Sequence, residues 1–147
     1  MRRAAVAPVL VVFAVLVGAC TTTSANAKKS TTKAGFIAQA DDICRTYADR
    51  AFKAGENVKH PNVNKQVALV QDRLVPLLEH RNAELAQLKP PPADRATITR
   101  FLADLNAATN AIGLDPAAFV AAGGTTALTQ KAAADAAAYG FEVCAQT

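Results

Sequence analysis

Helical periodicity restricts the fold of this chain more than any other property of its sequence. From residue 33 onward, apolar side chains recur every three or four positions, the spacing that places them on one face of an α-helix. Nowhere do β-branched residues alternate with polar ones in two segments that a tight turn could join. We therefore expect an all-α fold, in which residues 33–147 form an up-down four-helix bundle with a short extra helix between its third and fourth main helices.

Two long amphipathic helices are predicted first. One begins near Thr32, a candidate N-cap, and weakens around Gly55. The next follows an apolar stripe over residues 63–88 and stops at the prolines of residues 90–92. Pro76 lies within this stripe and has no N–H group, so we expect the helix to kink or break there.

The third main helix is expected to open at residues 92–94 and to end at Gly113. Asp115 followed by Pro116 is typical of an N-cap and the first helical position. This pair predicts the short extra helix over residues 116–122.

Gly123 and Gly124 separate the short helix from the last one, for which Thr125 or Thr126 is the candidate N-cap. The last helix is mostly alanine and other apolar residues, so we expect it to be the most buried of the helices. Its small side chains share one face and would let another backbone come close: Ala133, Ala137, Gly140 and Cys144.

Residues 1–19 have the organisation of an export signal, because Arg2 and Arg3 precede an apolar run that is shorter than the roughly 20 residues needed to span a bilayer. The sequence Val17-Gly18-Ala19-Cys20 that follows resembles the lipobox of bacterial lipoproteins. This resemblance implies that the Cys20 thiol receives a diacylglyceryl group and that cleavage just before Cys20 creates the mature N-terminus. Two alternatives stay open, an ordinary secretory signal with an incidental Cys20 and an uncleaved N-terminal anchor.

Residues 20–32 are small and polar, which predicts a disordered tether between the acylated Cys20 and the helical body. Lys28 and Lys29 in this region, and Lys33 directly after it, can contact anionic lipid or polymer near the surface. Residues 36–147 contain 11 Lys and Arg residues against 12 Asp and Glu residues, so the body has no basic surplus for nucleic acid. We expect a monomer on the extracytoplasmic face of the cell membrane.

Cys44 and Cys144 are the cysteines that remain once Cys20 is acylated. An exported chain meets an oxidising compartment, and the first and last helices of an up-down bundle are antiparallel neighbours. We therefore expect a disulfide, with two free buried thiols as the alternative. In the chain-entropy model, a bridge that closes a loop of about 100 residues contributes about 4.7 kcal/mol.

Two short segments carry a further resemblance. Residues 36–44 read FIAQADDIC and residues 139–144 read YGFEVC, behind the lipobox and on either side of a proline-rich break. Together they resemble small secreted or lipid-anchored helical proteins of actinobacteria. This resemblance implies the location, the bridge and the fold, and it implies no activity.

The chain lacks the usual residue patterns of metal and catalytic sites. His60 and His80 are its only histidines, both expected in water, and His-Glu-x-x-His, Glu-x-x-His and Cys-x-x-Cys are absent. The carboxylates of Asp41 and Asp42 would point about 100° apart on a helix, so we interpret them as acids favoured by the helix dipole. We expect no metal, no cofactor and no enzymatic activity.

Arg81 falls in the middle of an apolar stripe, which allows two interpretations. Its stem can pack while its head reaches water and meets Glu84, or the whole residue can be buried against an acid of another helix and line a pocket for an anionic ligand.

These observations favour a membrane-anchored lipoprotein that serves as an interaction or structural module of the cell envelope and has an unknown protein or envelope partner. The alternative is a carrier or sensor that binds an apolar or anionic ligand between the helices near Gly123 and Gly124. A cavity above about 300 Å³ beside the alanine-rich helix would favour the carrier, and a filled core would favour the interaction module.

Overall fold

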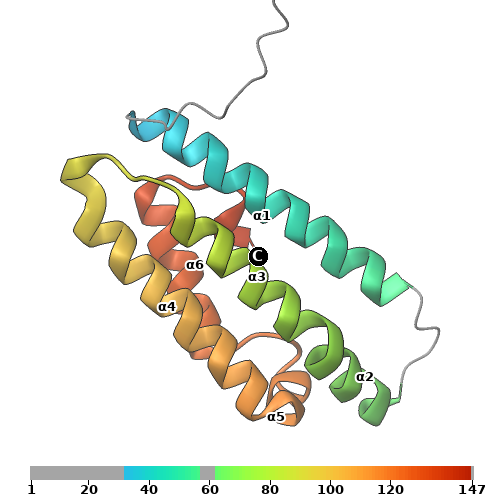
Figure 1. Ribbon diagram of the computed structural model, residues 1–147. Coiled ribbons are helices and arrows are strands. Elements are labelled where there is room, and N and C mark those ends of the chain that lie inside the picture. The colour runs from blue at the N-terminus through green and yellow to red at the C-terminus, as the bar shows by residue number, and fades with distance from the viewer. Residues whose placement is uncertain (1–31, 57–61, 147) are drawn as a thin grey trace, which may run out of the picture.

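The computed structural model describes residues 32–56 and 62–146, and this part of the chain is helical and contains no strand (Figure 1). The all-α fold expected from the periodicity is therefore confirmed. The expected signal, Cys20 and most of the tether lie outside the described residues. The elements, in chain order, are α1 (Lys33–Glu56), α2 (Val63–Leu69), the π-helical turn η1 (Val70–Leu74), α3 (Val75–Gln87), the 3-10 turn η2 (Pro92–Asp94), α4 (Arg95–Leu114), α5 (Pro116–Ala121), α6 (Ala127–Tyr139) and the 3-10 turn η3 (Cys144–Gln146).

Three predicted N-caps are confirmed. The Thr32 hydroxyl accepts a hydrogen bond at 3.2 Å from a backbone N–H in the first turn of α1. The Asp115 carboxylate accepts one at 2.8 Å from the N–H of Ala118 in α5. Thr126 forms a capping box with Thr129 at the start of α6. Each cap satisfies a backbone donor that the helix itself cannot pair.

The chain stays helical across Pro76, and the irregularity lies one turn earlier, in η1. Proline has no N–H and its ring crowds the carbonyl four residues before it, here that of Asp72. A wider π-turn that contains Asp72 accommodates this loss without ending the helix. Pro76 therefore does not split the predicted helix, and the irregularity expected there takes the form of the π-helical turn that precedes it.

Successive long helices run in alternating directions along the bundle (Figure 1). Helix α1 packs against α3, α3 against α4, and α4 against α6. The segment that follows α6 turns back, and its turn η3 contacts both α6 and α1. This C-terminal segment, residues 140–146, therefore links the last helix to the first.

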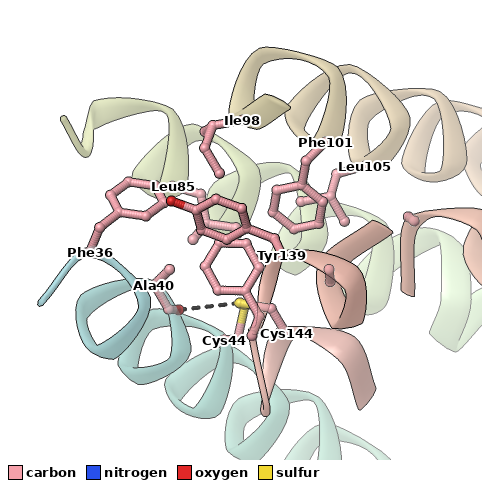
Figure 2. Packing of buried hydrophobic residues seen from close by; sticks show 12 residues of the cluster. Phe36, Ala40, Cys44, Leu85, Ile98, Phe101, Leu105, Tyr139 and Cys144 are labelled. Carbon is pink, nitrogen blue, oxygen red and sulfur yellow. Dashed lines mark hydrogen bonds between the residues drawn. A yellow bond between two sulfur atoms is a disulfide. The ribbon is translucent and has the colours of Figure 1, made fainter. Parts of the chain in front are cut away.

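The main core lies around a group of aromatic rings near the start of α1 (Figure 2). Phe36 meets Tyr139 edge to face, with ring centroids 6.1 Å apart. Phe141 of the C-terminal segment packs 4.9 Å from Tyr139 and 5.2 Å from Phe101 of α4. A second, smaller cluster joins η1, α4 and α5, and its buried members are Val70, Ile112 and Phe119.

The predicted course of the last helix is wrong after Tyr139. Gly140 has a φ of 108°, and its N–H and that of Phe141 close the helix by donating to the carbonyls of Ala137 and Ala136. Ala137 is exposed, so the expected face of small residues does not pack against another helix. The last helix is also not the most buried, since α6 buries three of 13 residues and α4 buries six of 20.

The predicted bridge between Cys44 and Cys144 is present, with the two Cα atoms 5.2 Å apart (Figure 2). Cys44 lies on α1, as expected. Cys144 lies in η3, after the chain has reversed direction, and not on the last helix. The close approach that a disulfide requires is therefore made by the C-terminal segment and not by two packed helices.

Candidate functional site

A cavity of about 280 Å³ lies among α3, α4, α5, α6 and the C-terminal segment. Its mouth is marked by lining residues that are exposed, including Gly124, Thr125 and Gln130. Its inner wall consists of residues that are buried: Arg81, Leu105, Ala108, Thr109, Ile112, Phe119 and Ala132. The cavity is therefore mostly apolar and opens to solvent at one side.

Arg81 of α3 is 4% exposed, so the interpretation in which its head reaches water is wrong. The stripe that carries Arg81 faces neighbouring helices along its length, because α3 packs against both α1 and α4. Desolvation lowers the pKa of the guanidinium to about 10. At neutral pH the group remains protonated, and it places a positive charge in the wall of the cavity.

A buried polar network orients Arg81. Its Nε and Nη2 atoms each donate to Oδ1 of Asn82 at 3.2 Å. The Asn82 amide donates in turn to Asn106 and to Thr109 of α4, both at 3.1 Å, and the Thr109 hydroxyl donates to the carbonyl of Leu105 at 2.9 Å. Within residues 32–56 and 62–146, every buried side-chain nitrogen and oxygen has a hydrogen-bond partner.

The sequence contained a signal for this network that periodicity alone did not use. Thr109 lies on the inward face of α4, between Leu105 and Ile112, and is 3% exposed. A buried hydroxyl needs hydrogen-bond partners. Besides the Leu105 carbonyl of its own helix, Thr109 has Asn82 of α3, which follows Arg81 directly in the sequence.

Helix α5 forms one wall of the cavity, close to the expected break at Gly123 and Gly124. Phe119 is buried and anchors α5 on the smaller core cluster. Gly123 and Gly124 have φ values of 69° and 82°, which L side chains rarely adopt. A side-chain Cβ at Gly124 would lie 3.8 Å from the Phe119 ring, so the turn passes directly over this anchor.

Asp41 holds the C-terminal segment in place, a role that sequence reasoning missed. Its carboxylate accepts three hydrogen bonds of 3.0 Å, from the backbone N–H groups of Glu142, Val143 and Cys144. Asp41 is 8% exposed, whereas the side chain of Asp42 is 79% exposed. The two neighbouring carboxylates therefore do not form a pair, and the helix-dipole interpretation does not account for Asp41.

A second hollow of about 390 Å³ is polar and lies between α4 and α6. Lys131 extends over this surface and forms ion pairs with Asp104 and Asp135. These hydrogen bonds raise the pKa of Lys131 and lower that of Asp135. Charges of both signs are already combined in this surface network, so it favours no ligand of one charge.

The two histidines do not contribute to a site in the described part of the chain. His80 is exposed on α3, and His60 lies outside the described residues. No group of three or more His, Cys, Asp or Glu residues among those described could hold a metal ion. None of the described helices combines the length and apolar character needed to cross a membrane.

No protein-family model, curated protein or solved structure matches this chain significantly.

Proposed function

We propose that this protein is a lipoprotein on the extracytoplasmic face of the membrane and that its helical body binds a small molecule without transforming it. The lipobox-like residues 17–20 support acylation of Cys20. The bridge between Cys44 and Cys144 supports export, because structural disulfides are typical of oxidising compartments. Two acyl chains would hold such a protein stably on the membrane, whereas one chain gives only reversible binding.

The cavity is the observation that carries the binding function. Its volume of about 280 Å³ lies just below roughly 300 Å³, which is both the lower end of ligand sites and the value above which the sequence analysis would favour a carrier. It adjoins the alanine-rich helix through Ala132 and Ala133, and it reaches Gly124. The described lining supplies apolar surface, hydroxyls, amides and the Arg81 guanidinium, a set suited to holding and orienting a ligand.

One other observation favours the interaction module. Three large apolar side chains stand exposed near the end of α1, at the start of α2 and at the end of α4, and these element ends lie toward the same end of the bundle (Figure 1). They are Phe52 at 68% exposure, Val63 at 63% and Leu114 at 86%. Exposed apolar groups that form one patch are typical of protein contacts, so a partner could dock at this end if the three lie together.

Mass spectrometry of the intact protein, isolated from the membrane of a bacterial host, tests both parts of the proposal. We expect an acylated chain that begins at Cys20, a bridge that removes two hydrogens, and a non-covalent small molecule that is retained under native conditions. A Cys20→Ala variant is the control, and it should lose the acyl mass while keeping the ligand. A chain that retains its leader would contradict the anchoring, and a ligand-free protein would favour the interaction module.

A further inference from the structure

We infer that the cavity is a site for a small uncharged molecule that consists mainly of hydrocarbon and carries at most one hydroxyl, which faces the mouth. This inference rests on the proposed binding of a small molecule and specifies its chemical class.

The inner wall of the cavity requires an apolar ligand. Hydrocarbon surface comes from several sides, because α3, α4 and α5 each contribute large side chains to the lining. They are Leu78, Leu105, Ile112 and Phe119. A ligand that covers these side chains removes apolar surface from water, which favours binding. A strongly hydrated ligand would gain little from them.

The polar groups of the inner wall do not select a charged ligand. Arg81 and Thr109 are the polar residues among those described there, and both are hydrogen bonded to Asn82. Throughout residues 32–56 and 62–146, no buried side-chain nitrogen or oxygen lacks a partner. An ionic head that entered the cavity would lose its water and meet groups that are already engaged, which is unfavourable for a charge. An uncharged ligand avoids this cost.

The mouth differs from the inner wall, because its exposed residues include polar side chains. Thr125, Gln130 and Gln146 line the cavity and are exposed. Their hydroxyl and amide groups can exchange hydrogen bonds with a ligand hydroxyl and with water alike. A hydroxyl at one end of the ligand is therefore expected at the mouth, with the hydrocarbon directed inward.

One side of the cavity is fixed before a ligand arrives. Ala145 and Gln146 line the cavity and directly follow Cys144. Cys144 is held by the bridge to Cys44 and by the hydrogen bond that its N–H donates to Asp41. A site that needs little rearrangement loses less entropy when a ligand binds.

The volume of the cavity sets the size of the ligand. In an engineered protein, an apolar cavity of about 150 Å³ holds one benzene molecule, which has about six heavy atoms. By proportion, about 280 Å³ accommodates about 11 heavy atoms. 1-Octanol, which has nine heavy atoms and a single terminal hydroxyl, is a suitable probe.

Isothermal titration at neutral pH with 1-octanol, octanoate and octylammonium tests the charge of the ligand at nearly constant size. The full chain is used as isolated, in lipid nanodiscs if it is acylated and in buffer if it is not, and empty nanodiscs give the free concentration of each probe. We expect saturable octanol binding with a Kd on the order of 0.1 to 1 mM. Octanoate and octylammonium should each bind at least about tenfold more weakly, because their charges are costly to bury. 1-Hexanol, which is two methylenes shorter than octanol, should also bind roughly tenfold more weakly.

Two variants of α6 test whether the probe occupies the cavity. Ala133 lines the cavity and is half-buried, so Ala133→Leu fills part of the space and should weaken octanol binding by about tenfold. Ala134→Leu is the matched control, because the next residue is exposed and does not line the cavity, and it should bind octanol like the wild type. Urea unfolding of both variants measures whether they fold.

A measurement on the wild type does not depend on the folding of any variant. Backbone amide chemical shifts of Gly124, Ala132 and Ala133 should move with octanol in a saturable manner. The amide of Ala38, which is exposed on α1 outside the cavity lining, should stay in place.

Several results would overturn the inference. They are octanoate or octylammonium binding as tightly as octanol, a folded Ala133→Leu variant binding octanol like the wild type, or shifts confined to residues outside the cavity. A charged probe that binds as tightly as octanol removes only the uncharged class and leaves the small-molecule function standing. Absence of any bound probe overturns the inference, while the ligand retained in the intact protein decides the proposed function independently.

Discussion

Asp41 and Arg81 are buried charged residues that meet the cost of desolvation in different ways. Asp41 accepts three backbone N–H groups of the C-terminal segment. Arg81 donates to the amide of Asn82, which is itself held from α4. Burying a charge costs several kcal/mol unless hydrogen bonds compensate for the lost water. Asp41 therefore acts within the fold, by fixing a segment, whereas Arg81 lies in the wall of a cavity.

Asp41→Ala should lower the free energy of unfolding by about 3 kcal/mol. The substitution removes three hydrogen bonds to a charged acceptor and leaves three backbone donors without it. Urea unfolding followed by circular dichroism measures the loss. Asp42→Ala is a matched control on the next residue, since the exposed Asp42 forms only a surface contact with Arg45, and it should change stability by less than about 0.5 kcal/mol. Equal losses in the two variants would show that Asp41 does not hold the segment.

Tyr139→Phe should reveal a pH-dependent contribution to stability. Burial, with a smaller effect from the hydrogen bond that its hydroxyl donates to Asp94 at 2.8 Å, raises the pKa of Tyr139 above its usual value. A raised pKa means that the contribution is complete below about pH 10 and declines as the pH rises above that value. Wild type should exceed Tyr139→Phe by about 1 kcal/mol at pH 7 to 9.

The difference between these two proteins should shrink progressively above pH 10, as urea unfolding at stepwise pH values would show. Tyr47, whose pKa is raised by its hydrogen bond to Glu84, is present in both proteins. Arg81, whose pKa is lowered by burial, is also common to both. Their own titrations therefore cancel in the difference. A difference that stays constant up to pH 11 would contradict the assigned hydrogen bond and burial.

Helix α6 ends at a C-cap glycine, Gly140, which directly follows its last residue. Gly140 has a φ of 108°, a conformation that is strained for any residue with a Cβ. Gly140→Ala should therefore destabilise the protein by about 1 to 2 kcal/mol, measured by thermal or urea unfolding. Gly55→Ala is the control, because Gly55 lies within α1 with open space around its Cα, and alanine there should be neutral or stabilise by up to about 1 kcal/mol. The reverse order of the two variants would contradict this assignment.

Local signals predicted most helix boundaries, because caps and breakers act on the residues beside them. Thr32, Asp115 and Thr126 cap helices as their side chains suggested. The end of α6 was missed, because Gly140 fits both a closely packed helix face and a helix terminus. The two possibilities differ only in whether residues 141–144 can return to α1, and this depends on Asp41, about 100 residues away.

At the candidate site, too, the local pattern could be predicted from the sequence, whereas the contacts between helices could not. The position of Arg81 in an apolar stripe marked it as unusual, and the burial of its head depended on how α3 packs between α1 and α4. Periodicity describes one helix at a time and contains no information on its neighbours. The inward position of Thr109 could have been noticed in the sequence, but its bond to Asn82 follows only from how α3 and α4 pack together.

Across the whole molecule, the two core clusters are stabilised differently. The larger one joins α1, α3, α4, α6 and the C-terminal segment, and the bridge between Cys44 and Cys144 is part of it. The smaller one, with α5 on the cavity side, consists of three buried residues and contains no covalent link among the described ones. The part of the fold beside the cavity is therefore better able to open than the bridged part, which is what the proposed ligand binding would require.

Removal of the bridge should destabilise the whole bundle. The double variant Cys44→Ala/Cys144→Ala releases a loop with a sequence separation of 100 and should lose about 4 to 5 kcal/mol in urea unfolding. Cys20→Ala is the control, and it should leave the unfolding of the helical body unchanged.

The bridge and Asp41 both hold the C-terminal segment, because the Asp41 carboxylate accepts a hydrogen bond from the N–H of Cys144 itself. Combining Asp41→Ala with the double variant should therefore cost less than the sum of the separate losses. Strict additivity of the stability losses would mean that the carboxylate and the bridge act independently. That result would contradict the expected coupling, because both make contact with Cys144.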